Sequence, residues 1–145
     1  MKTILILLIS ISIFVNAEFK RDDNGIVTDT KSALFWQDDF RNENNNTQGE
    51  LAWRDALIYC EALTLGDYND WRVPNINELS TLLDRNKELY RSEVFLYPLY
   101  WDWTWSSSTS PSNPYNALCV AFSSEVSYFS FDKVKTLSVR CVRGG

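Results

Sequence analysis

The clearest periodic pattern of apolar residues lies in the stretch Glu50–Thr64. Trp53, Ala56, Leu57 and Cys60 recur there at spacings of three and four positions, whereas the charged residues fall on another face. This spacing predicts a first helix. Its apolar stripe would carry Cys60 toward the core.

A second helix is predicted by residues that cap a helix N-terminus rather than by a periodic pattern of apolar residues. Asn75 can cap a helix with its side-chain oxygen, and Glu78, three residues later, can reach back to the cap's own N–H. Pro74, just before the cap, keeps the preceding chain extended. We therefore expect a helix over residues 76–84, entered from a loop in which Trp71 is a core residue and Arg72 pairs with a carboxylate such as Glu78.

Short apolar or alternating runs predict strands at both ends of the chain. These runs are Ile26–Asp29, Ala33–Gln37, Trp103–Ser107, Ala117–Phe122, Val126–Phe131 and Leu137–Val142. The first two form an opening hairpin, and the turn Ser123-Ser124-Glu125 suits a central hairpin. The mixed stretch Asn86–Tyr100 is expected to be a long loop. The pattern predicts an α+β domain with two helices on small antiparallel sheets.

The first residues have the composition of a secretory signal. Lys2 supplies a positive charge, Ile4 to Val15 form an apolar run, and Val15-Asn16-Ala17 is a small-residue cleavage pattern. We expect residues 1–17 to be a signal peptide and residues 18–145 to be a single domain. No later run approaches about 20 apolar residues, so no membrane span is expected after cleavage. The protein would be exported to the periplasm, the cell surface or the exterior.

Charge and aromatic content narrow the possible partners. Without Lys2 the chain has 13 basic and 19 acidic residues, which is the wrong balance for a nucleic-acid binder and unfavourable for strong binding to sulfated polysaccharides. A local basic patch of Lys133, Lys135, Arg140 and Arg143 remains an alternative. The six Trp, seven Tyr and eight Phe mostly fill the core and leave a few rings for a binding face.

Three cysteines in an oxidising compartment favour one disulfide and one free thiol. A bridge from Cys60 to Cys141 closes a loop of about 81 residues and would stabilise the fold by roughly 4.5 kcal/mol. A bridge from Cys119 to Cys141 closes a loop of about 22 residues and would contribute roughly 3.4 kcal/mol, so the stabilisation energies hardly separate the two pairings. Cys119 lies in an apolar run, where a free thiol behaves as a small buried hydrophobe. We therefore favour the bridge between Cys60 and Cys141, with Cys119 free.

Several segments taken in order resemble one protein family. They are Ile26-Val27-Thr28-Asp29, Leu34-Phe35-Trp36-Gln37, Trp53-Arg54-Asp55-Ala56 with Tyr59-Cys60, Asp70-Trp71-Arg72-Val73-Pro74-Asn75 with Glu78-Leu79, Trp105-Ser106-Ser107-Ser108 and Val139-Arg140-Cys141-Val142-Arg143. Together they are similar to the Lcl C-terminal domain, a bacterial exported domain of unknown function. The Asp-Trp-Arg-Val-Pro block and the closing Arg-Cys-Val-Arg are its specific parts.

The resemblance implies a fold like that of C-type lectins and of formylglycine-generating enzymes. It also implies a bridge from the first helix to the last strand, again Cys60 to Cys141. The residues that would serve the scaffold are Trp36, Trp53, Asp70, Trp71, Arg72, Pro74, Asn75, Glu78, Trp105 and Arg140. This fold hosts sugar binding, protein recognition and oxidation, so it does not fix the function.

Two sharper functions receive little support from the sequence. A calcium site needs six to eight oxygens, and Asp67, Asn69 and Asp70 fit a solvated turn better. An oxidase of the formylglycine-generating class would need a reactive cysteine pair, yet only Cys141 lies in the matching strand. The chain has no His to activate a thiol. We expect no catalytic residue, no metal and no cofactor.

A binding role rests on aromatic residues interleaved with short polar ones. Rings stack on sugar faces or anchor protein contacts. Trp101, Trp103 and Trp105 share one face of an extended strand and Asp102 and Thr104 the other, and one of these faces should be core.

The candidate ligand-binding residues are Tyr97, Tyr100, Trp101, Asp102 and Tyr115. The sequence thus favours a non-catalytic exported recognition module for a glycan or protein ligand. The alternatives are an enzyme that uses Cys141 and a purely structural envelope protein.

Overall fold

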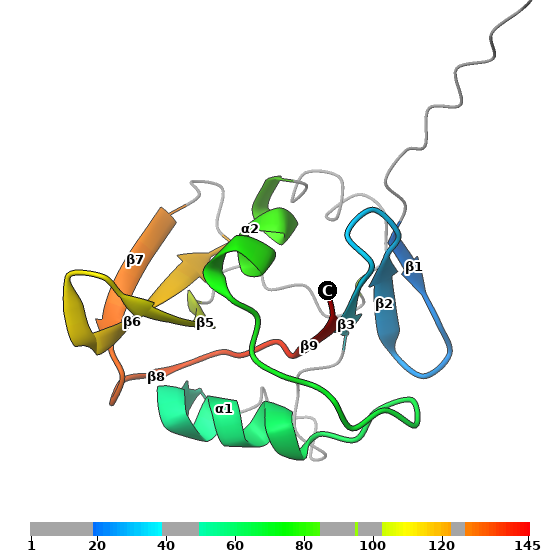
Figure 1. Cartoon of the computed structure of the whole chain (residues 1–145), viewed down its shortest axis with the longest axis horizontal. Coiled ribbons are helices and arrows are strands. Elements are labelled where there is room, and N and C mark those ends of the chain that lie inside the picture. Colours follow the sequence, from blue (N-terminus) through cyan, green and yellow to red (C-terminus); the bar gives the residue numbers. More distant parts are fainter. Residues whose placement is uncertain (1–18, 39–49, 85–94, 96–102, 123–126) are drawn as a thin grey trace, which may run out of the picture.

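The computed structural model describes residues 19–38, 50–84, 95, 103–122 and 127–145, and it has an α+β fold (Figure 1). The strands are β1 (Phe19–Arg21), β2 (Ile26–Asp29), β3 (Leu34–Gln37), β4 (Leu51–Ala52), β5 (Trp103–Ser110), β6 (Asn113–Ala121), β7 (Ser127–Asp132), β8 (Thr136–Leu137) and β9 (Val142–Gly144). The helices are α1 (Trp53–Ala62) and α2 (Ile76–Asp84). The predicted signal peptide and most of the predicted long loop lie outside the described residues.

The strands form small antiparallel sheets. One has the order β1-β2-β3-β9, a second pairs β4 with β8, and a third has the order β5-β6-β7. In Figure 1 the four-stranded sheet lies at the right and the three-stranded sheet at the left, and the chain through β8 and β9 runs from one to the other. The two ends of the described chain therefore meet in one sheet.

Both predicted hairpins are present. Strand β2 pairs with β3 from Ile26 opposite Gln37 to Asp29 opposite Leu34, and Ala33 has a φ of 56° at the turn. Strand β6 pairs with β7, while the turn predicted between them lies outside the described residues. Strand β1, which the sequence pattern did not predict, adds to the edge of the first hairpin.

The first helix is shorter than predicted. It covers Trp53–Ala62, because Leu51 and Ala52 pair with β8 as strand β4. The Trp53 N–H donates to the Lys133 carbonyl at 3.1 Å and so cannot belong to a preceding helical turn. Pairing with a distant segment therefore overrides the local helical pattern at this end. Helix α2 has the bounds that were predicted.

The predicted last strand, Leu137–Val142, is also wrong as one element. The chain pairs first with β4 as β8 and then with β3 as β9, and the residues between change sheet. In that crossing Ser138 N–H donates to Trp103 O at 3.0 Å, and Trp105 N–H donates to Ser138 O at 2.9 Å. These bonds satisfy the backbone groups of the crossing segment, as buried peptide groups require.

The core has two clusters of buried side chains. One surrounds Trp36 and includes Leu79 of α2 and Val120 of β6, and the other surrounds Trp105 and the cysteine residues. Full burial of each large apolar side chain contributes roughly 1.5–3 kcal/mol. The expectation that one face of this strand is core is confirmed at Trp105, which is fully buried. The other face is also enclosed at Thr104.

No helix among the described residues is long and apolar enough to cross a membrane.

Candidate functional site

The predicted disulfide is present. Cys60 on α1 and Cys141 just before β9 are bonded, with an S–S distance of 2.06 Å, and both residues are fully buried. The bridge ties the first helix to the chain that leads into the last strand. Because its sulfur is bonded, Cys141 has no thiol with which to act as an oxidase nucleophile.

The third cysteine is a buried thiol. Cys119 Sγ lies 3.4 Å from the Phe129 carbonyl oxygen, to which it donates, and burial raises the pKa of this thiol to about 12. Thiolates rather than thiols are nucleophiles and metal ligands. Cys119 therefore functions as a core residue, as predicted.

The start of α2 has the predicted capping box. Glu78 N–H donates to Asn75 Oδ1 and Asn75 N–H donates to Glu78 Oε2, each at 2.9 Å. The Arg72 guanidinium forms two bonds with the Glu78 carboxylate, at 2.7 and 2.8 Å, and a third with the Gly144 carbonyl at 2.7 Å. Burial raises the pKa of Glu78, but the bonds from Arg72 and Asn75 outweigh it, so this pKa lies below its usual value.

The remaining residues of the recognised motif also build the scaffold. Trp71 is buried, and Pro74 is fully enclosed. Trp53 Nε1 donates to Ser106 O at 2.8 Å, and Trp105 Nε1 donates to Leu51 O at 2.7 Å. These indole bonds join the β5 region to the start of α1.

Of the three residues considered as calcium ligands, Asp70 is paired with an arginine. Asp70 accepts two bonds from Arg143, at 2.6 and 3.1 Å, and these bonds lower the pKa of Asp70. The Arg143 guanidinium also lies 3.6 Å from the centre of the Tyr68 ring. In the described part of the chain, no three Asp, Glu or Cys side chains lie close enough together to hold a metal ion.

The basic patch considered from sequence does not form. Arg140 is almost fully buried, where its Nη1 donates to the Gln37 carbonyl at 2.9 Å and lies 3.9 Å from Asp38 Oδ1. Lys133 lies 4.1 Å above the Trp53 ring and donates to Thr109 Oγ1. Arg140 is thus a buried scaffold residue. The carboxylate near it, Asp38, comes from a distant part of the sequence, so the sequence alone left the patch alternative open.

Four of the five predicted ligand-binding residues, Tyr97, Tyr100, Trp101 and Asp102, lie outside the described residues. The fifth, Tyr115 on β6, is 76 % exposed. By strand alternation it projects from the face opposite to Leu118, and so it does not join the concave surface described next.

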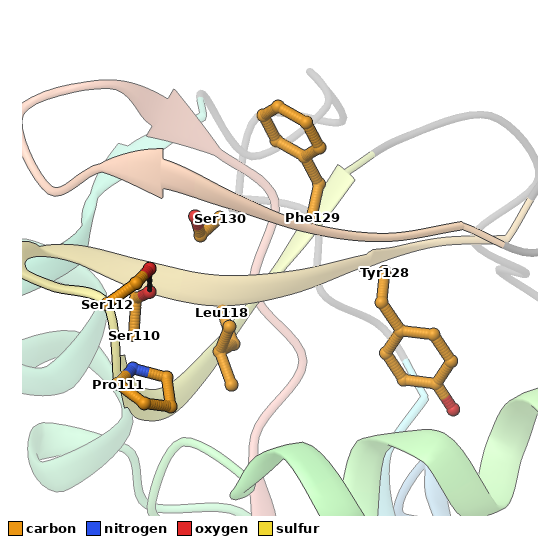
Figure 2. A pocket seen from close by; sticks show the side chains of 7 residues that line it. All are labelled: Ser110, Pro111, Ser112, Leu118, Tyr128, Phe129 and Ser130. Carbon is orange, nitrogen blue, oxygen red and sulfur yellow. Dashed lines mark hydrogen bonds between the residues drawn. The ribbon is translucent and has the colours of Figure 1, made fainter.

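A hollow of about 400 Å³ lies on the three-stranded sheet (Figure 2). Its lining residues are Ser110, Pro111, Ser112, Leu118, Tyr128, Phe129 and Ser130. Leu118 and Tyr128 point to the same side of the sheet, whereas Phe129 points to the other side. Tyr128 is opposite Val120, which packs against α2, so the hollow lies on the face of the sheet that carries α2.

The hollow combines apolar surface with hydroxyl groups and has no charged residue in its lining. Tyr128 is 55 % exposed and offers its ring. Ser110 and Ser112 at the tip of the β5–β6 hairpin lie with their hydroxyls 3.1 Å apart, and Ser130 is opposite Leu118 across the ladder. The arrangement can stack against an apolar surface and hydrogen-bond to neutral polar groups.

Tyr128 was not among the residues predicted to bind a ligand. A usable signal was present, because Tyr128 and Phe129 are adjacent in a predicted strand and cannot both face one core. On the opposite face, Phe129 is 54 % exposed, and its ring centre lies 5.9 Å from Trp103 and 4.8 Å from Phe131. Strand β7 therefore presents aromatic rings on both of its faces.

Comparison with known proteins adds one assignment. No curated protein matches the chain as a relative. The family described as the Lcl C-terminal domain matches residues 25–143, which include every described residue from the first hairpin to Arg143. The capping box, the buried Trp71 and the bridge at Cys141 all fall within this range. The chain belongs to the Lcl C-terminal domain family.

Proposed function

We propose that this protein is an exported, non-catalytic recognition module that binds a neutral glycan in the hollow beside Tyr128. The observation that carries the proposal is the uncharged lining, to which an exposed tyrosine ring and three serine residues contribute. Sugar rings have apolar faces that stack on aromatic rings and hydroxyls that exchange hydrogen bonds with serines.

The size and charge of the hollow agree with such a ligand. Its volume of about 400 Å³ falls within the roughly 300–1,000 Å³ that is common for small-ligand sites. A sulfated or phosphorylated ligand would find no positive partner in the lining, and the chain's net charge of −5 would repel it. A neutral mono- or oligosaccharide has no such penalty.

Export is part of the same proposal. It is supported by the signal pattern in residues 1–17 and by a buried disulfide, a bond that persists in oxidising compartments. A C-type-lectin-like relationship, which the resemblance implies, would fit a sugar-binding role. The N-terminal sequence of the protein recovered outside the cytoplasm tests export, and we expect it to begin at Glu18.

The binding test compares two exposed tyrosines on opposite faces of one sheet. A panel of neutral oligosaccharides is titrated into isotope-labelled protein and followed by NMR. We expect shifts at Ser112 and Ser130 and a loss of affinity of about tenfold in Tyr128→Ala, because truncating an aromatic anchor often costs more than 1 kcal/mol. Tyr115→Ala serves as the matched control and should bind normally. Equal losses in both variants, or shifts confined to other surfaces, would overturn the assignment of this hollow.

A further inference from the structure

The outer edge of β7 has backbone groups that β6 does not use. Just beyond the end of β7, Lys133 N–H donates to Tyr115 O at 3.0 Å, so the Lys133 N–H is directed toward β6. In an antiparallel ladder, the N–H and C=O groups face the partner strand at every second residue. Counting back from Lys133, these are the odd-numbered residues of β7, such as Phe129, and their backbone groups face β6. The N–H and C=O groups of Tyr128 and Ser130 therefore point away from the sheet.

This edge is open within the described part of the protein. Strand β7 is the last strand in the order β5-β6-β7, and its pairing with β6 is continuous from Asp132 to Ser127. Among the described residues, no backbone or side-chain group pairs with the outward groups of Tyr128 and Ser130. Proteins usually protect such an edge with Lys, Pro or a bulge, and the segment from Tyr128 to Phe131 has none of these.

Both faces beside the edge can receive side chains. On one face the half-exposed Tyr128 ring borders the hollow, and on the other the half-exposed Phe129 ring lies in a cluster with Trp103 and Phe131. A strand added to an edge gains affinity from main-chain hydrogen bonds and specificity from pockets for alternate side chains. The β7 edge supplies both.

We propose that the β7 edge binds an extended segment of a partner protein by strand addition. The segment would have uncharged apolar residues at alternate positions, to cover Tyr128 and Phe129. It would have a Lys or Arg near Asp132, the one charged residue of β7 and an exposed one. This proposal does not rest on glycan binding, because it uses backbone groups at the edge rather than the floor of the hollow.

A second copy of the chain fits this edge less well than a separate peptide segment. Each copy has a net charge of −5, which opposes self-association. A flexible segment, in contrast, can follow both faces of the strand.

Peptides from a random displayed library are selected for binding to the whole wild-type protein and, separately, to the Ser130→Pro variant. Proline removes one outward N–H and leaves the ladder to β6 intact, a position at which edge strands tolerate it. We expect alternating apolar sequences with a basic residue to be enriched on the wild type, and a synthetic copy of the best peptide to bind Ser130→Pro about tenfold more weakly. Ser130→Lys replaces the proline variant if amide spectra show that the latter is not folded.

Amide hydrogen exchange then locates the bound peptide. Its binding should slow exchange at Tyr128 and Ser130 by about tenfold or more and leave Phe129 unchanged, since the Phe129 N–H already bonds to β6. Methylating those peptide nitrogens that face β7 should abolish binding, and methylating the alternate nitrogens should not.

Three results would overturn the proposal. The first is equal enrichment of the same peptides on the wild type and on Ser130→Pro. The second is unchanged amide exchange at Tyr128 and Ser130 when the peptide is bound. The third is amide protection at the edge that rises with protein concentration in the absence of peptide, which would indicate a second copy. Glycan titration of the wild-type protein reports separately on the hollow, so failure there leaves the exchange result standing.

Discussion

Replacing Cys60 and Cys141 together by alanine is expected to lower the free energy of unfolding by about 4–5 kcal/mol. The bridge spans 81 positions of sequence. On the chain-entropy treatment, a closed loop of that length removes roughly 15 cal/mol/K from the unfolded ensemble, or about 4.5 kcal/mol at 25 °C. Folded domains have only about 5–15 kcal/mol of stability in total, so the variant should lose between roughly a third and nine-tenths of it.

Urea denaturation followed by tryptophan fluorescence measures this loss, with the oxidised wild type as reference. Cys119→Ala is the matched control, because it removes a fully buried sulfur without opening a bridge. That control should cost only about 1 kcal/mol, the scale of a small core truncation. A double variant that loses no more than twice the control value would refute the reasoning, since packing alone would then account for the effect.

Two further outcomes follow from the titrating groups. Glu78→Gln should destabilise the protein by about 1 kcal/mol at pH 7, because it keeps the cap but loses the charged bond to Arg72. The native pKa of Glu78 lies below its usual 4.5, so this difference should be full above pH 4.5 and disappear as the pH falls through the native value. Urea titrations at several pH values measure it, and a pH-independent gap would contradict it. Cys119 has a pKa of about 12 in the folded protein, so only about one native thiol in 10,000 is ionised at pH 8. It should therefore resist iodoacetamide until urea unfolds the chain. Rapid labelling of the native protein would contradict its burial.

Features encoded by neighbouring residues could be predicted from the sequence. The capping box at Asn75 and Glu78 involves a spacing of three residues, and the observed helix α2 begins and ends where that signal placed it. The pair between Arg72 and Glu78 is similarly local. In each case both partners lie within six residues, so the distant parts of the fold do not alter the geometry.

Features that depend on distant partners could not be predicted in the same way. Helix α1 begins late because Leu51 and Ala52 pair with β8, more than 80 residues further along the chain. Arg140 was predicted to serve the scaffold, with a surface basic patch as the alternative, but the sequence did not show its neighbour: it is buried close to Asp38, about 100 residues earlier in the sequence. Periodicity carries no information on such pairings.

The same limit explains why Tyr128 was missed. Alternation shows that Tyr128 and Phe129 lie on opposite faces of a strand, but only the sheet order shows that this strand is at an edge, where both faces can stay half-exposed. Edge position also gives Tyr128 two separable surfaces, a ring that borders the hollow and backbone groups that point outward. Tyr128→Ala removes the ring and retains the outward backbone groups, whereas Ser130→Pro removes one outward N–H and retains the ring, but it also removes one of the hydroxyls that line the hollow. If the protein binds both a glycan and a peptide strand, Tyr128→Ala should weaken glycan binding more than strand binding, and Ser130→Pro should weaken strand binding more than glycan binding.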